Sequence, residues 1–197
     1  MIFNNNNISF SKLCEIMYDK GFEFASHTYF KSIDDIKDYL NLKKPDNCDY
    51  KPNNSILYFS PIINKKTTEW KEFSKSWTDV CDRNIIFIKY KKLNILNSKF
   101  NIKSFDKTLY KLSIIKQIGF YLIKYNWKKI SKNYDGFYYS ASNQKLSSLK
   151  NSFGDMWDVT TLIIWNFNCI KEIYLFKSIG KNKFSTNYNL ISYYICI

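Results

Sequence analysis

The chain has 197 residues, of which 45% are hydrophobic and 19% aromatic, so it can bury a sizeable core and is not expected to be disordered. Its formal charge is +13, an excess that is typical of proteins binding nucleic acids or anionic membranes. Arg83 is the only arginine, however, and phosphate recognition by geometry relies on the planar fork of arginine. We therefore interpret the lysine excess mainly as the codon bias of an AT-rich genome, with weak, salt-dependent binding of polyanions still expected.

The cysteines and the histidine exclude several kinds of site. Five cysteines, an odd number without a C-x-x-C pair, argue against a disulfide framework and against zinc. His27 is the only histidine, which argues against His-based metal sites and Cys-His nucleophile schemes. We expect no metal cofactor, and reduced thiols in a cytoplasmic setting.

No targeting or membrane segment is expected either. The start of the chain lacks the basic and long apolar parts of a signal peptide. No apolar run approaches the ~20 residues of a membrane helix, so no membrane partner is predicted.

The first half of the chain predicts alternating helices and strands behind a polar tail at 1–8. In chain order these are a helix from Ser9 or Ser11 to Lys20 that Gly21 stops, a strand at 22–30, a helix after Ser32, a strand at 56–60 that Pro61 ends, a Thr-capped helix at 67–77, and a strand at 84–90. Trp70, Phe73 and Trp77 are spaced to form one buried face of their helix. The near-continuous apolar character of 84–90 predicts a central strand.

The second half predicts mostly strands. The expected elements are a possible strand at 93–100, a long helix at 105–124, a short helix at 127–133, a strand after Asp135-Gly136, a helix or loop at 143–153, strands at 160–167 and 170–176, and a terminal strand within an extension at 178–197. Helices early and strands late indicate one α+β domain over 1–197, with a split, mainly antiparallel sheet.

Phosphate-cradling and hydrolase motifs are absent from the sequence. There is no G-x-x-x-x-G-K-S/T and no G-x-S-x-G, and the chain has only 5 glycines. The carboxylates Asp34 and Asp35 favour a helix start, where they stabilise the helix dipole.

Three stretches remain for function: "FASHTYF" at 24–30, "ILYFSP" at 56–61, and "YDGFYY" at 134–139 followed by "WDVTTLIIWNFNCIKEI". An early strand with the adjacent pair His27-Thr28, a later "YFS" strand and a downstream "YDG" resemble the ADP-ribosyltransferase-like superfamily. Within it, the order of these patches between residues 51 and 174 resembles uncharacterised proteins of phages and large DNA viruses.

The resemblance implies a site for NAD. His27 would hydrogen-bond the ribose of the nicotinamide half, beside Thr28, although the family prefers His-Gly-Thr. Tyr58 would stack on the nicotinamide ring with Ser60 beside it. The glutamate that the family uses to favour the oxocarbenium-like transition state falls on Tyr138, which carries no negative charge at neutral pH. Asp135 would bind the cofactor, and Asp135 or Glu172 would have to replace the missing charge.

Each of these residues also has a plainer interpretation. His27 is equally read as an ordinary strand histidine, Tyr58 as a core residue, and Asp135-Gly136 as a turn in which Gly136 takes a positive φ.

Three functions stay open at this stage. The first is an ADP-ribosyltransferase-like protein of a virus or another AT-rich organism, which binds NAD or a related nucleotide, is degenerate or active, and if active passes ADP-ribose to a host macromolecule. The second is a viral accessory protein that binds a host protein through exposed tyrosines. The third is a nucleic-acid-binding module based on lysine and tyrosine.

Overall fold

The computed structural model describes residues 7–42, 45, 55–74, 83–97, 113–117, 120–124, 127–141, 159–179 and 187–196. The chain divides into two compact units. The first comprises Met1–Asp38, Phe59–Lys91 and Ile170–Ile197, and the second comprises Tyr39–Tyr58 and Lys92–Cys169. Helices combined with mainly antiparallel strands confirm the predicted α+β class. The expectation of one domain over 1–197 stays a prediction, and each unit is described by itself.

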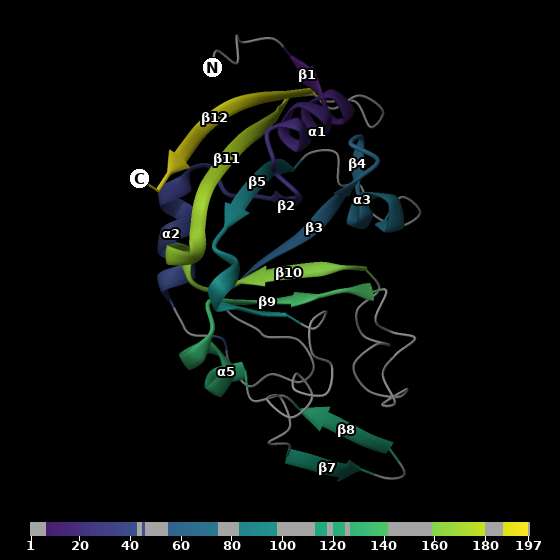
Figure 1. The fold of residues 1–197 in the computed structure, drawn as a ribbon, viewed down its shortest axis with the longest axis vertical. Coiled ribbons are helices and arrows are strands. Elements are labelled where there is room, and N and C mark those ends of the chain that lie inside the picture. Colours follow the sequence, from purple (N-terminus) through teal and green to yellow (C-terminus); the bar gives the residue numbers. More distant parts are fainter. Residues whose placement is uncertain are drawn as a thin grey trace. The chain divides into compact units, whose positions relative to one another are not determined.

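The first unit contains an antiparallel sheet of long strands. Its strand order is β1 (Ile8–Ser9), β12 (Asn187–Ile195), β11 (Ile170–Ile179), β5 (Asn84–Tyr90), β2 (Phe24–Thr28) and β3 (Leu57–Ile63), with β4 (Thr67–Thr68) paired to β3 (Figure 1). Strand β3 belongs to this unit from Phe59 onward. The strand predicted at 84–90 is β5, and it lies in the interior of the sheet between β11 and β2. Ile8, which the sequence assigned to the polar tail, already belongs to β1.

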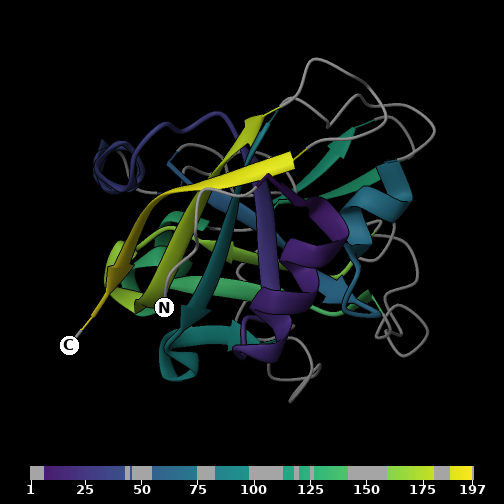
Figure 2. The same cartoon turned by 90° about the horizontal axis from the view of Figure 1, so that it is seen from above.

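Helix α1 (Phe10–Asp19) begins and ends as predicted. The Ser9 hydroxyl accepts a hydrogen bond from the Lys12 amide at 3.4 Å, and this caps the first turn. At the other end Gly21 has a φ of +83°, and its amide donates to the Tyr18 carbonyl at 2.8 Å. Figure 2 shows α1 lying beside the strands of the first unit.

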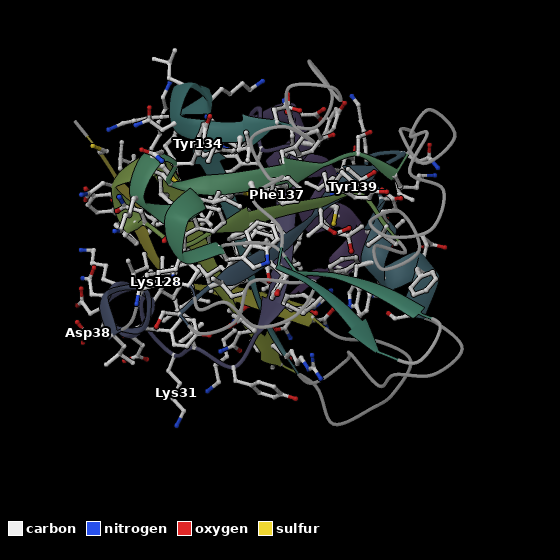
Figure 3. The ribbon with its side chains drawn as sticks, turned by 90° about the horizontal axis from the view of Figure 1, so that it is seen from below. Lys31, Asp38, Lys128, Tyr134, Phe137 and Tyr139 are labelled. Carbon is white, nitrogen blue, oxygen red and sulfur yellow. The ribbon has the colours of Figure 1, made fainter. Side chains whose placement is uncertain are left out.

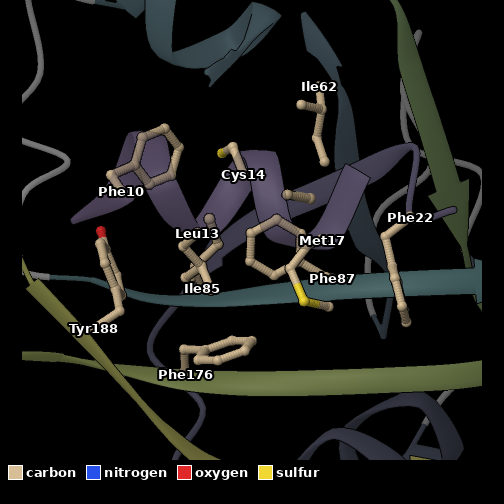
Figure 4. Close-up of a cluster of buried hydrophobic side chains, with 11 residues drawn as sticks. Phe10, Leu13, Cys14, Met17, Phe22, Ile62, Ile85, Phe87, Phe176 and Tyr188 are labelled. Atoms are coloured by element: carbon tan, nitrogen blue, oxygen red, sulfur yellow. The ribbon is translucent and has the colours of Figure 1, made fainter. Parts of the chain in front are cut away.

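One face of α1 builds the core of the first unit. Phe10, Leu13, Cys14 and Met17 are buried against the sheet (Figure 4). The strands contribute Ala25, Ile62, Ile85, Phe87, Phe176 and Tyr188 to this cluster. Phe87 and Phe176 meet edge to face, with 5.8 Å between ring centroids.

Helix α2 (Ile33–Leu42) carries the cap that the sequence predicted. The Asp35 amide donates to the Ser32 hydroxyl at 3.0 Å, and the Ser32 amide donates to the Asp35 carboxylate at 3.0 Å. This reciprocal pair satisfies two amides that a helix start leaves unbonded. A side-chain hydrogen bond with Ser32 is the largest cause of the lowered pKa of Asp35, and the Lys31 and Ser32 amides, which both donate to its carboxylate, also lower it.

Helix α3 (Glu69–Phe73) confirms its predicted cap but not its predicted face. The Thr68 hydroxyl accepts from the Lys71 amide at 3.2 Å. No residue of α3 is buried, and Phe73 is 39% exposed, so the prediction of a buried face with Trp70 and Phe73 is wrong. A five-residue helix has too few turns to cover a sheet, and its two aromatic rings pack on each other instead, 5.8 Å apart. Trp77 lies outside the described residues.

Strand β3 runs through Pro61, which contradicts the expected stop at this residue. Phe24 pairs with Pro61 in the antiparallel register of β2 and β3, and the Ile62 amide donates to the Glu23 carbonyl at 2.9 Å. Proline is tolerated where a strand does not need the amide for its ladder. This ladder has only two residue pairs, so the proline sits at its end.

The second unit has its own strands and core. Strand β9 (Gly136–Tyr139) pairs antiparallel with β10 (Thr161–Ile164) and parallel with β6 (Ile95–Asn97). Helix α5 (Trp127–Asn133) confirms the short predicted helix. Its Trp127 packs edge to face on Phe137 and on Trp165. Phe137, which Figure 3 labels together with Tyr139, is completely buried. Two 3-10 turns complete the unit, η2 (Lys92–Asn94) and η5 (Phe167–Cys169).

The long helix predicted at 105–124 is wrong. Residues 113–117 form β7 (Ser113–Gln117), residues 120–124 form β8 (Phe120–Lys124), and the two strands pair antiparallel with Gln117 opposite Phe120. Two adjacent isoleucines in β7 and an aromatic pair in β8 favour strands, and Gly119 falls between them in the sequence. The helix or loop expected at 143–153 lies outside the described residues.

Candidate functional site

His27 lies on the face of the first unit's sheet that α1 covers. In the register of β2 and β5, His27 is opposite Ile85 and Ala25 is opposite Phe87, and all three of these partners belong to the cluster under α1. The imidazole stacks on the ring of Phe10, the first residue of α1, with 5.5 Å between centroids and 26° between planes. The cap at Ser9 thus fixes the position of the aromatic ring that holds the histidine.

The two ring nitrogens of His27 are buried, and neither has a hydrogen-bond partner among the described residues. The side chain as a whole is half-buried, so it is the nitrogen atoms that are enclosed. This burial, followed by the positive charges of Lys71 and Arg83, lowers the pKa of His27 to about 3. His27 is therefore a neutral imidazole at pH 7, with one N–H donor and one acceptor nitrogen unused.

Ser60 shares the His27 face, whereas Thr28 does not. Ser60 pairs with Ala25 across β2 and β3, which places it on the side of the sheet that also carries His27. Its hydroxyl oxygen accepts from the Trp70 amide at 2.8 Å, at the start of α3. Thr28 follows His27 in the strand and points to the opposite face, where its hydroxyl accepts from the Phe30 amide at 3.3 Å.

Tyr58, Tyr138 and Asp135 belong to the second unit. Tyr58 is 38% exposed, and burial of its hydroxyl, followed by the nearby Tyr39, raises its pKa. Tyr138 is half-buried on β9, where its register partners are Leu162 and Asn97. The predicted apposition of His27 and Tyr58 across a nucleotide-sized hollow stays a prediction, since the two residues belong to different units.

The Asp135 side chain holds two loops of the second unit together. One carboxylate oxygen accepts from the Asn166 side-chain amide at 2.6 Å, and the other accepts from the Asn94 side-chain amide at 3.0 Å. The Asp135 amide donates to the Asn94 carbonyl at 2.9 Å, and its carbonyl accepts from the Trp165 amide at 3.1 Å. Asp135, which directly precedes β9, thus connects the start of this strand to Asn94 before β6 and to Trp165 and Asn166 after β10. Its predicted role in cofactor binding stays a prediction.

Gly136 is required by close packing and not by the positive φ that the sequence suggested. Gly21 is the only glycine with positive φ in the described part of the chain. A Cβ on Gly136 would lie 2.3 Å from the Ile163 carbonyl oxygen and 2.8 Å from the Ile95 side chain. The glycine lets β9 approach β10 on one side and β6 on the other.

Glu172, the other carboxylate considered as a substitute, forms an ion pair. Its carboxylate lies 2.8 Å from the Lys89 ammonium, and both side chains are mostly buried. The same ammonium lies 4.6 Å from the centroid of the Phe22 ring. The charge of Glu172 is therefore balanced within the protein. Sequence reasoning missed this pair, because it bridges strands 83 residues apart.

The sequence also did not reveal the surroundings of His27. Phe10, Lys71 and Arg83 come from three separate segments, and only the register of β2 with β5 and the position of α1 bring them together. The amphipathic pattern after Ser9 was the available signal, because it indicated that a helix would cover one sheet face.

Among the residues with described positions, no group of three or more His, Cys, Asp or Glu is arranged to hold a metal ion. None of the helices in that part of the chain combines the length and apolarity needed to span a membrane. No family model matches the chain, and no curated protein or solved structure matches it either.

Proposed function

We propose that this chain is an ADP-ribosyltransferase-like protein that binds NAD or a related nucleotide, and that His27 contacts the ribose of the nicotinamide half. The observation that carries the proposal is the neutral imidazole of His27, whose two buried nitrogens have no partner in the described part of the chain. A buried polar atom without a partner costs about 1–3 kcal/mol, so a ligand that supplies one is favoured.

The chemistry around His27 suits a ribose that carries phosphates. A ribose hydroxyl donates and accepts, and it can satisfy either nitrogen of a neutral imidazole. The positive charges of Lys71 and Arg83, which act on His27, would attract the pyrophosphate of NAD. Ser60 on the same sheet face offers a hydroxyl proton, because its hydroxyl oxygen is engaged as an acceptor. Tyr58 is assigned to the nicotinamide ring, which it would contact by stacking.

The proposed function is binding with little or no transfer of ADP-ribose. Breaking the bond between nicotinamide and ribose develops positive charge on the ribose, and a fixed carboxylate stabilises that charge. Tyr138 stands at the position where the family has a glutamate. Asp135 is engaged by two asparagine amides and Glu172 by Lys89, so both candidate substitutes serve the fold. Any residual activity would pass ADP-ribose to a host macromolecule.

Isothermal titration with NAD, ADP-ribose and nicotinamide tests this proposal. We expect NAD to bind, and we expect His27→Ala and Tyr58→Ala each to weaken binding by about tenfold, which corresponds to about 1.4 kcal/mol. Matched controls are Ser26→Ala, beside His27 on the opposite sheet face, and Tyr18→Ala, a tyrosine exposed to a similar degree on α1. Binding that survives both site substitutions would refute the assigned site, and the absence of any binding would refute the function.

A second candidate, a host-protein-binding accessory factor, is favoured by one feature of β12. Ile191, Tyr193 and Ile195 alternate along this strand and are 41%, 60% and 47% exposed, which makes a continuous apolar stripe. Tyr193 stacks on Tyr174 with 5.5 Å between ring centroids, so its ring is held in place before any partner arrives.

The stripe makes a test possible that is independent of NAD. Tyr193→Ser should abolish a specific complex recovered from host lysate. Leu93→Ser should leave that complex intact, because Leu93 is 96% exposed and lies in the other unit. Equal effects of the two substitutions would argue against this candidate.

A further inference from the structure

A hollow lies in the first unit, around the end of β2 and the start of β5. Its volume is about 550 Å³, within the range of small-molecule sites. The residues that line it include Thr28, Tyr29, Lys31, Asn84, Lys177 and Ser178. Thr28, the last residue of β2, pairs with Asn84, the first residue of β5. These two residues mark one end of the hollow.

The floor of the hollow is a built polar surface. The Asn84 side-chain amide donates to the Phe30 carbonyl at 2.8 Å, and its oxygen accepts from the Ser178 amide at 3.1 Å. One asparagine thereby ties the chain after β2 to strand β11. Thr28 is 7% exposed, and its hydroxyl holds the Phe30 amide. These bonds fix the floor before a ligand binds, which lowers the entropy lost on binding.

The rim of the hollow is positively charged. Lys31 and Lys177 are both exposed, and neither forms an ion pair with any residue whose position the structure describes. Figure 3 shows the Lys31 side chain extending outward. None of the lining residues whose positions the structure describes is an aspartate or a glutamate. Lys31 also acts electrostatically on the Asp35 carboxylate, which does not line the hollow, and the two ammonium groups together produce a local positive potential over the polar floor.

Tyr29 adds a flat surface beside the two lysines. It is 73% exposed, and the Arg83 guanidinium lies 4.8 Å from the centroid of its ring. Because Tyr29 is so exposed, it contributes little to the core. Its ring can instead cover a planar or sugar-like group of a ligand. The Nε atom of Arg83 is buried and has no partner among the described residues.

We propose that this hollow binds the phosphate group of a small phosphorylated molecule, with Lys31 and Lys177 neutralising the anion. Lysine serves here as a mobile point charge, while the Thr28 hydroxyl proton and the second side-chain amide proton of Asn84, which the bonds of the floor do not use, orient the ligand. His27 is not among the described lining residues, and Thr28 and His27 point to opposite faces of β2, whereas Arg83 lies near both His27 and Tyr29. The hollow gives the lysine excess a specific location, where composition alone indicated only codon bias.

Titration calorimetry with inorganic pyrophosphate, at low and constant ionic strength, tests the proposal on the full chain. The double variant Lys31→Gln/Lys177→Gln should weaken pyrophosphate binding at least about tenfold, because it removes both rim charges. The matched control is Lys66→Gln/Lys171→Gln, which removes the same charge from two exposed lysines of the same unit outside the hollow. This control should bind pyrophosphate as the unchanged chain does.

The remaining outcomes also decide the question. His27→Ala should leave pyrophosphate binding unchanged. The phosphate-site proposal therefore does not fail if the nucleotide proposal fails. Three results would overturn the proposal: no binding of pyrophosphate, an equal loss in both double variants, or a loss caused by His27→Ala alone. The second result would show general charge attraction, and the third would place the anion at the other site.

Discussion

His27 in the first unit and Asp135 in the second are both polar residues at a strand that the sequence singled out, but their polar atoms are used in opposite ways. Every oxygen of the Asp135 carboxylate accepts an asparagine amide, and its backbone amide and carbonyl are bonded as well. Both nitrogens of His27 are buried without a partner in the described residues. A polar residue whose bonds are all made within the chain is explained by the fold, whereas one with unmade bonds calls for a ligand.

The largest effect is expected from Gly136→Ala, which tests how tightly the second unit is built around Asp135. The added Cβ would lie 2.3 Å from a backbone oxygen that cannot rotate away, so we expect a loss of about 3 kcal/mol or more of unfolding free energy. Denaturant unfolding measures it. Gly21→Ala is the matched control, because its neighbours leave 3.7 Å and only the φ of +83° is strained, at a cost of about 1 kcal/mol.

Asp135→Ala should destabilise the protein by about 2–3 kcal/mol at pH 7, because two asparagine amides lose a charged acceptor. His27→Leu should cost almost nothing under the same conditions, since it removes two unpaired polar atoms and keeps the packing on Phe10. Chemical denaturation of both variants measures the contrast. A similar loss in the two variants would contradict the distinction between them.

The pH dependence of stability should depend on His27. Its pKa is lowered to about 3 in the folded chain, so the unfolded chain binds an additional proton as the pH falls below about 6.5. The stability contributed by the neutral imidazole is present above that value and decreases toward the folded pKa, by about 2 kcal/mol between pH 7 and pH 5. Unfolding free energies at the two pH values should show this loss in the unchanged chain and not in His27→Leu. An identical slope in both would refute the burial of the ring nitrogens.

The smallest effect concerns the thiol of Cys14, which lies in the cluster beside Phe10. Burial raises its pKa to about 12, despite the opposing charge of Lys71, so its reactive thiolate is scarce at neutral pH. Cys196 is exposed. Alkylation followed by peptide mass spectrometry should label Cys14 at least about a hundredfold more slowly than Cys196. Equal rates would show that the cluster under α1 opens readily to solvent.

The sequence predicted local features well where a single residue enforces them. Ser9, Ser32 and Thr68 cap helices as expected, because a cap requires only neighbouring amides. The apolar run at 84–90 was correctly placed inside a sheet, since only two-sided burial explains such a run. The helix expected at 105–124 failed because apolar residues alone do not distinguish a helix from a hairpin, and the paired isoleucines of β7 carried the stronger preference.

The candidate site was predictable only in part. The resemblance placed His27 and Thr28 in one site, whereas neighbouring residues of a strand such as β2 point to opposite faces. The Asp135 carboxylate accepts hydrogen bonds from Asn94 and Asn166. The surroundings of His27 come from positions 10, 71 and 83. Because these residues are distant in the sequence, the pattern of neighbouring residues does not predict either environment. The role of Gly136 was misjudged for the same reason, because the carbonyl that excludes a Cβ belongs to another strand.

The most direct test of the central claim is nitrogen-15 NMR of the single imidazole during titration with NAD. Since His27 is the only histidine in the chain, its ring signals need no further assignment. We expect a neutral imidazole at pH 7 whose ring nitrogen shifts move with added NAD and saturate together with the binding isotherm. A protonated ring at pH 7, or ring signals that stay unchanged at saturating NAD, would contradict it.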